Sequence, residues 1–164
     1  MIEVPQELSN FKSSLEGKTG NMKSASSNMQ SKISSLSSTT NTVQNGIDES
    51  YQSENKPTLL NSFGSINTSL TQIGSSLGEM NAILARVDNL IDKIVQLEEL
   101  CETINKLESN LSSKKSEPEK DSSEISRLEG EISEKKATFE NDKNEALSEL
   151  DSLKSEDISL DVSI

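Results

Sequence analysis

The sequence predicts an all-α protein: an elongated, antiparallel three-helix arrangement that combines a helical hairpin with a coiled-coil arm. Only 2% of the 164 residues are aromatic and 30% are hydrophobic, which suits slender helices packed side by side better than a wide core. Apolar residues recur at steps of three, four and seven along most of the chain, the spacing of a helical stripe. Polar breaks near residues 46–57 and 112–123 divide this stripe into three parts, and short breaks favour antiparallel neighbours.

The first helix is expected at about residues 6–46. Its stripe runs from Leu8 to Val43, and Ser, Thr and Asn fill most of the remaining positions. These residues are mediocre helix formers, so the helix must be stabilised by packing against a partner. Asn45-Gly46 and Pro57 mark the break that follows it. Three methionines on the first two stripes are interpreted as adaptable core: Met22, Met29 and Met80.

The second helix is expected at about residues 57–113, and a short break favours folding it back on the first. Reflection about residue 55 pairs Val43 with Ile66. The predicted hairpin domain therefore covers residues 1–112.

The third helix is expected at about residues 122–154. Residues 113–154 form the coiled-coil arm, which folds back on the second helix, and residues 155–164 form a flexible tail. The arm and the first helix overlap along the second helix near residues 84–101, where apolar doublets supply two faces: Ile83-Leu84, Leu90-Ile91 and Ile94-Val95. We therefore expect a three-helix middle, with the segment Leu84–Leu100 the most buried.

The composition argues against an enzyme and against a cofactor or metal site. The chain has no histidine and a single cysteine, which excludes Ser-His-Asp and Cys-His catalysis and an intrachain disulfide. That residue, Cys101, is interpreted as a reduced core cysteine. The net charge of −12 makes nucleic acid a poor partner.

No long apolar run predicts a transmembrane segment. The first residues lack a basic region followed by a hydrophobic one. If the protein leaves the cell, we expect it to be secreted without a cleaved signal peptide and to be cytoplasmic before export.

The end of the hairpin is the candidate partner-binding site. Residues 1–80 carry five lysines against seven acidic residues, a charge of only −2, which leaves little electrostatic obstacle to an acidic partner. Two packed helices also leave the flanks of their stripes exposed. The candidate interface residues are Val43, Ile47, Tyr51, Phe63, Ile66 and Ile73.

Residues 1–95 resemble the small helical-hairpin proteins of type VII (ESX) secretion, the Trp-x-Gly family and its relatives. The resemblance lies in the opening Met1-Ile2-Glu3-Val4-Pro5-Gln6-Glu7-Leu8, in the Ser/Asn-rich first helix, in Gly46-Ile47-Asp48-Glu49-Ser50-Tyr51, and in a second amphipathic helix from Leu59 to Leu84. The chain has no tryptophan, with Asn45-Gly46 nearest to the family turn. Four residues after Tyr51 stands Asn55, where the family export signal has Asp or Glu. The chain is thus more similar to the divergent members that accompany LXG-domain toxins.

This resemblance implies a non-enzymatic helical adaptor or targeting partner that binds an LXG-type toxin or a sister helical protein by helix packing, as a secreted protein or a chaperone. Two alternatives stay open. One is a structural coiled-coil spacer that self-assembles, and the other is the helical targeting domain of an LXG toxin itself. The partner is a protein in each case, in a homo- or hetero-oligomer.

Overall fold

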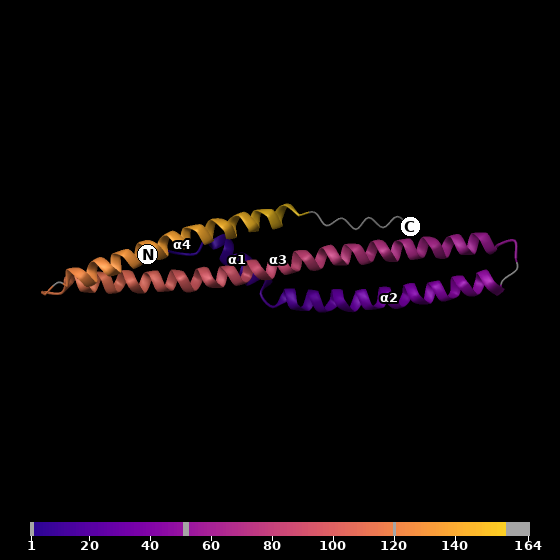
Figure 1. The fold of residues 1–164 in the computed structure, drawn as a ribbon, viewed down its shortest axis with the longest axis horizontal. Coiled ribbons are helices and arrows are strands. Elements are labelled where there is room, and N and C mark those ends of the chain that lie inside the picture. The colour runs from indigo at the N-terminus through magenta and orange to yellow at the C-terminus, as the bar shows by residue number, and fades with distance from the viewer. Residues whose placement is uncertain (1, 51–52, 120, 157–164) are drawn as a thin grey trace. The chain divides into compact units, whose positions relative to one another are not determined.

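The computed structural model describes residues 2–50, 53–119 and 121–156, with the Ser50 side chain left out. Every regular element in these ranges is a helix, which confirms the all-α class: α1 is Gln6–Leu15, α2 is Lys18–Ser50, α3 is Lys56–Ser116 and α4 is Ser122–Ser155 (Figure 1). The chain divides into two compact units, and α3 contributes to both. The arm unit contains residues 2–16 and 86–156, and the hairpin unit contains residues 17–85.

The helix expected at residues 6–46 is two helices, so the prediction of one continuous element is wrong. α1 ends at Leu15, and Gly17 has φ +77°, a left-handed conformation that glycine adopts without the penalty of a Cβ. The expected end at Asn45-Gly46 is also wrong, because α2 continues to Ser50. A glycine inside a helix costs only about 1 kcal/mol relative to alanine, which neighbouring contacts can offset.

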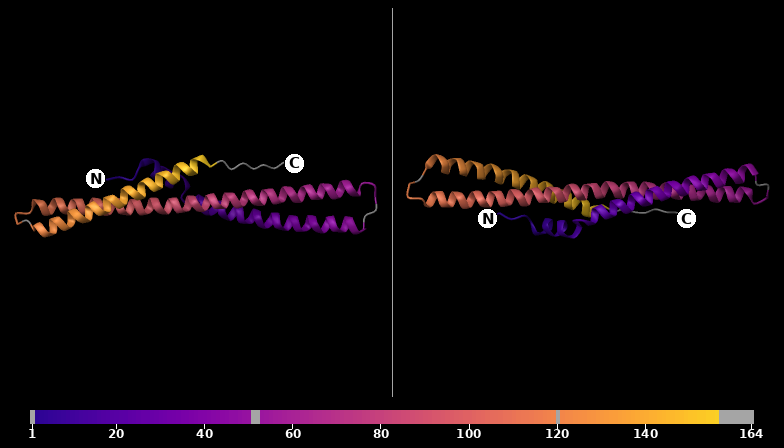
Figure 2. Two further views of the ribbon diagram at one scale, coloured as in Figure 1. Left: turned by 45° about the horizontal axis from the view of Figure 1, so that its top comes forward. Right: turned by 90° about the horizontal axis from the view of Figure 1, so that it is seen from below.

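In the hairpin unit, α2 runs beside the first half of α3 (Figure 2). The Asn67 amide nitrogen on α3 donates to the Asn41 side-chain oxygen at 2.6 Å and to the Gln44 side-chain oxygen at 3.4 Å. Asn67 follows Ile66, and residues 41 and 44 lie on either side of Val43. The antiparallel register expected from the sequence therefore holds here.

In the arm unit, α4 packs against the second half of α3 (Figure 2). Ion pairs join the two helices in antiparallel order, from Lys115–Glu129 at one end to Arg86–Glu149 at the other. The Asp121 carboxylate begins α4 by accepting hydrogen bonds from two backbone amides of its first turn. The core of the unit consists of Leu8, Leu90, Ile94, Leu97, Ile104, Ile132, Phe139, Ala146 and Leu150.

The expected burial of α3 between Leu84 and Leu100 is confirmed: the buried residues there are Leu84, Val87, Leu90, Ile94 and Leu97. Cys101 is a free, half-buried thiol packed against the arm-unit core. None of the helices, over the residues described, carries a stretch long and apolar enough to cross a bilayer.

Candidate partner-binding surface

α2 carries two rows of residues with seven-residue spacing, and they differ in exposure. The inner row is Thr19, Ser26, Ile33 and Thr40, in which the three polar residues are buried and Ile33 is half-buried. The outer row, three positions further along, is Met22, Met29, Leu36 and Val43, whose exposure is 42–51%. α2 therefore buries mostly small polar side chains and leaves its larger apolar ones outside. The interpretation of Met22 and Met29 as core residues is wrong.

The first half of α3 repeats this division with more apolar residues. Its inner row is Phe63, Leu70, Leu77 and Leu84, of which the three leucines are buried and Phe63 is half-buried. Its outer row is Leu59, Ile66, Ile73 and Met80, of which the first two are exposed and the others half-buried. Ile33 on α2 and Leu70 on α3 line one groove of the hairpin, which places the inner rows between the helices.

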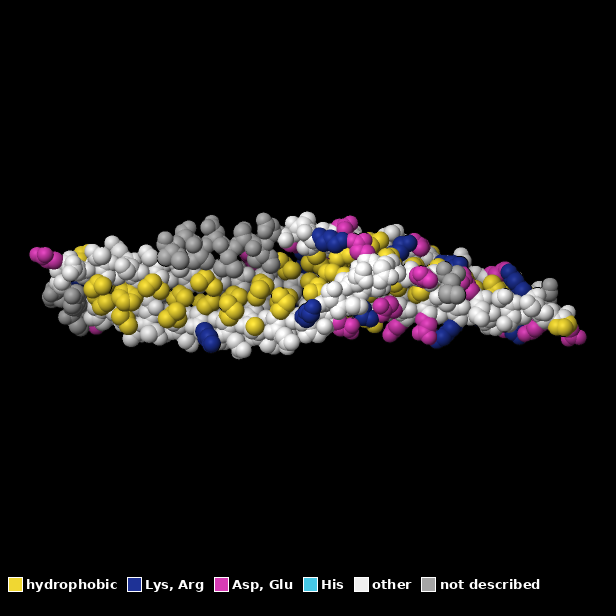
Figure 3. All heavy atoms as spheres, turned by 180° about the vertical axis from the view of Figure 1, so that it is seen from behind, with side chains coloured by type: hydrophobic (Ala, Val, Ile, Leu, Met, Phe, Trp, Pro, Cys, Tyr) yellow, Lys and Arg dark blue, Asp and Glu magenta, His cyan; other side chains and the backbone are white. Residues whose placement is uncertain are grey.

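The outer rows fall on one face of the hairpin. In two antiparallel helices whose inner rows meet, positions three residues after each inner row turn toward the same side. Figure 3 shows the result as a band of hydrophobic side chains along the hairpin. Among the described residues, the large hydrophobics that are strongly exposed all belong to these rows: Met22, Met29, Leu36, Val43, Leu59 and Ile66.

Single exposed apolar residues are normal on a protein surface. Two parallel rows at heptad spacing are different, because this is the pattern of a coiled-coil seam that packs against a further helix. The hairpin also has no net charge: residues 17–85 contain four lysines and four acidic residues, and residues 57–78 contain none of either. A helix lying on this face would thus meet little of the chain's net charge of −12.

The seam between the two hairpin helices is unusually polar. Ser26 is fully buried, and its hydroxyl has no hydrogen-bond partner in the part of the chain described. The buried Thr40 hydroxyl donates to the Leu36 carbonyl one turn earlier at 2.8 Å. Buried hydroxyls contribute less to stability than apolar groups of the same size. Closure of the hairpin alone therefore uses little of the apolar surface that α2 offers.

The structure distributes five of the six sequence-predicted interface residues over both kinds of row. Val43 and Ile66 are exposed on the outer rows, and Ile73 lies half-buried on the same row as Ile66. Ile47 continues the inner row of α2 and Phe63 belongs to that of α3, and both are half-buried.

The sixth predicted interface residue, Tyr51, lies outside the described residues. The sequence analysis missed four outer-row residues: Met22, Met29, Leu36 and Leu59. The unbroken seven-residue spacing of each row could have identified these four residues from the sequence.

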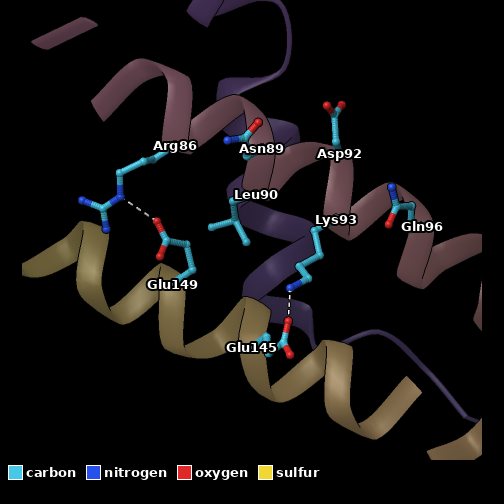
Figure 4. Close-up of a pocket in the computed structure, with 8 residues that line it drawn as sticks. All are labelled: Arg86, Asn89, Leu90, Asp92, Lys93, Gln96, Glu145 and Glu149. Atoms are coloured by element: carbon cyan, nitrogen blue, oxygen red, sulfur yellow. Dashed lines mark hydrogen bonds and ion pairs between the residues drawn. The ribbon is translucent and has the colours of Figure 1, made fainter. Parts of the chain in front are cut away.

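The arm unit contains a groove of about 720 Å³ between α3 and α4 (Figure 4). Its cations are already paired: Arg86 Nε lies 2.8 Å from Glu149 Oε1, and Lys93 pairs with Glu145. The Arg86 guanidinium donates hydrogen bonds to the carboxylates of Glu149 and Glu156, and these bonds raise its pKa above its ordinary value. Its paired charges thus hold α4 on α3 and do not form a cluster aimed at a ligand. Among the described residues no three His, Cys, Asp or Glu side chains form a group able to hold a metal ion.

No family model, no curated protein and no solved structure matches this chain. What it does is therefore inferred from its own surfaces, of which the hairpin face is the most distinctive.

Proposed function

We propose that the chain is a non-enzymatic helical adaptor of a type VII secretion system, which binds an LXG-type toxin or a sister helical protein along the outer rows of its hairpin unit. One observation carries the binding role: two apolar rows at heptad spacing lie on one face of a hairpin that has no net charge, and most of their side chains are exposed. The secretion context rests on the resemblance of residues 1–95 to the Trp-x-Gly family and its LXG-associated relatives.

The size of the face suggests what the partner supplies. From Met22 to Val43 the outer row spans 21 helical positions, which is about 32 Å of helix and matches roughly three heptads of a partner helix. Full burial of a large apolar side chain is worth about 1.5–3 kcal/mol, so completing the burial of a half-exposed one gains about 1 kcal/mol. Association costs at least about 4 kcal/mol. A stable complex therefore needs a partner that buries an apolar row of its own.

Co-expression with candidate helical partners followed by size-exclusion chromatography tests this function. The candidates are the N-terminal helical region of an LXG toxin and small helical proteins encoded beside it. Leu36→Lys and Ile66→Lys place a charge in the outer rows and should abolish co-elution, because a buried unpaired ammonium is strongly unfavourable.

Ser38→Lys is the matched control, since Ser38 is exposed two positions after Leu36 on α2, outside both rows. It should co-elute like the wild type. Co-elution of both outer-row variants at the wild-type level would show that the partner binds elsewhere.

The self-assembling alternative is favoured by a separate observation. Along α2 the lysines lie in the first half, Lys18, Lys23 and Lys32, and the acidic residues Asp48 and Glu49 lie near its C-terminal end, where Asp48 pairs with Lys56. Two copies packed antiparallel through the outer rows would bring opposite charges together. Analytical ultracentrifugation of the chain alone distinguishes the two functions, because only self-assembly gives a concentration-dependent oligomer that Leu36→Lys dissociates.

A further inference from the structure

The outer row of α2 continues in phase beyond the start of the helix. Seven and fourteen residues before Met22 stand Leu15 and Leu8, so one heptad series runs from Leu8 to Val43. In the structure the series is interrupted at Gly17, with φ +77°. Leu8 is fully buried in the arm unit, and Leu15 is half-buried. Leu8 and Leu15, which the heptad series assigns to the outer row, are therefore not part of that row in the structure.

The N-terminal segment, residues 2–15, is held in the arm unit by a small number of specific contacts. The Asn105 side chain on α3 pairs with the backbone of Ile2, accepting from its N–H and donating to its carbonyl, both at 3.1 Å. The Cys101 thiol donates to the same carbonyl at 2.9 Å. Further along, Lys12 pairs with Glu98 at 2.6 Å, and Glu7 pairs with Lys154 of α4. Leu8 is buried in the arm-unit core, and Ile2, Val4 and Phe11 pack against that core, so these contacts together make up the docked state.

The junction between α1 and α2 is built so that it can become helical. Glu16 has a helical φ of −53° and departs from the helix only through its ψ of 126°. A Cβ built on Gly17 meets nothing within 4 Å, so no side chain blocks this position. Glutamate and lysine flank the glycine, and both are good helix formers. Rotation at two neighbouring residues therefore joins α1 and α2 into one helix.

We propose that residues 2–15 switch between two positions: docked in the arm unit, and continuous with α2, where Leu8 and Leu15 lengthen the outer row. The switch itself is a property of the free chain. Its consequence rests on the proposed function: a partner that covers the lengthened row binds the continuous form more tightly. By linkage that partner draws the segment out of the arm unit.

The single cysteine of the chain supplies the reporter. Cys101 contacts Ile2, so its reaction with a thiol reagent should quicken when the segment leaves. Gly17→Ala disfavours the left-handed backbone of the docked state and favours a helix at the same residue. We expect Cys101 in the full-length variant to react about 5- to 30-fold faster than in the wild type.

Gly46→Ala is the matched control, because Gly46 lies inside α2, has no positive φ and has open space around its Cβ position. It should leave the Cys101 rate within about twofold of wild type, because helix propensity changes far from the junction do not touch the docked segment.

Hydrogen exchange separates the switch from simple fraying. The first amides of a helix have no partner within that helix, so the amides of residues 18–20 gain partners only when α1 joins α2. Gly17→Ala should slow their exchange while Cys101 reacts faster. Asn105→Ala removes the hydrogen bonds to the backbone of Ile2 and leaves the junction unchanged. It should likewise slow amide exchange at residues 18–20 and quicken the reaction of Cys101.

The switch is refuted if Cys101 reacts with the thiol reagent at the wild-type rate in the Gly17→Ala variant. It is also refuted if Cys101 reacts faster but the amides of residues 18–20 exchange hydrogen faster as well, because the segment has then only frayed. Because these measurements need no partner, their failure leaves the proposed function standing if Leu36→Lys still loses the partner. If these measurements confirm the switch but Leu36→Lys still binds the partner as well as the wild type does, the proposed function is refuted and the switch stands.

Discussion

A matched pair of leucine-to-alanine substitutions tests the central claim that the outer rows are exposed in the free chain. Leu97 is 1% exposed in the arm-unit core and Leu36 is 51% exposed on the outer row. Leu97→Ala removes buried methyl groups and leaves a cavity, which costs about 2–5 kcal/mol. Leu36→Ala leaves no cavity and forfeits about half of a leucine's burial energy, offset by the better helix propensity of alanine, so its cost is about 1 kcal/mol or less.

Urea unfolding followed by circular dichroism at 222 nm measures both costs, at two protein concentrations. The expected result is a large loss for Leu97→Ala and a small, concentration-independent one for Leu36→Ala. Equal losses for the two variants would refute the exposure of the outer row in solution. A loss for Leu36→Ala that grows with protein concentration would show that a second copy covers the row.

Two further predictions follow from single side chains. Ser26→Ala should stabilise the hairpin by about 1 kcal/mol, because it removes a buried hydroxyl without a partner and improves helix propensity; thermal unfolding checks this, and an unchanged or lower melting temperature would contradict it. Lys136 hydrogen-bonds Glu108 across the arm unit and lowers the pKa of that carboxyl. Since the folded pKa lies below the unfolded one, the pair stabilises above the unfolded pKa and the effect is lost as pH falls through the folded pKa. The difference in melting temperature between wild type and Lys136→Gln should therefore shrink from pH 7 to pH 3, and a constant difference would exclude the pair as its cause.

The helices and their pairing followed from the sequence wherever apolar spacing was strong. The doublets near Leu90 and Ile94 marked the buried stretch of α3, and reflection about residue 55 gave the observed register at Asn67. The break at Gly17 was missed because the heptad series passes through it in phase. Periodicity indicates which face a residue would occupy in a helix. The hydrogen bonds that hold Ile2 in the arm unit join residues 99 and 103 positions apart, so they leave no local signal in the sequence.

The sequence placed the candidate binding surface at the end of the hairpin and missed the exposed residues along the first part of α2, and the reason is physical. Sequence reasoning assumes that the most apolar positions of a helix face its neighbour, and α2 reverses this by burying Thr19 and Ser26 while exposing Met29 and Leu36. A two-helix hairpin that maximised its own burial would turn the outer row inward. In the observed arrangement, side-chain hydrogen bonds from Asn67 to Asn41 and Gln44 join the two helices beside the inner rows. The outer rows are left exposed, and this unexpected position of methionine and leucine on α2 is the observation that supports the proposed packing of the hairpin against a further helix.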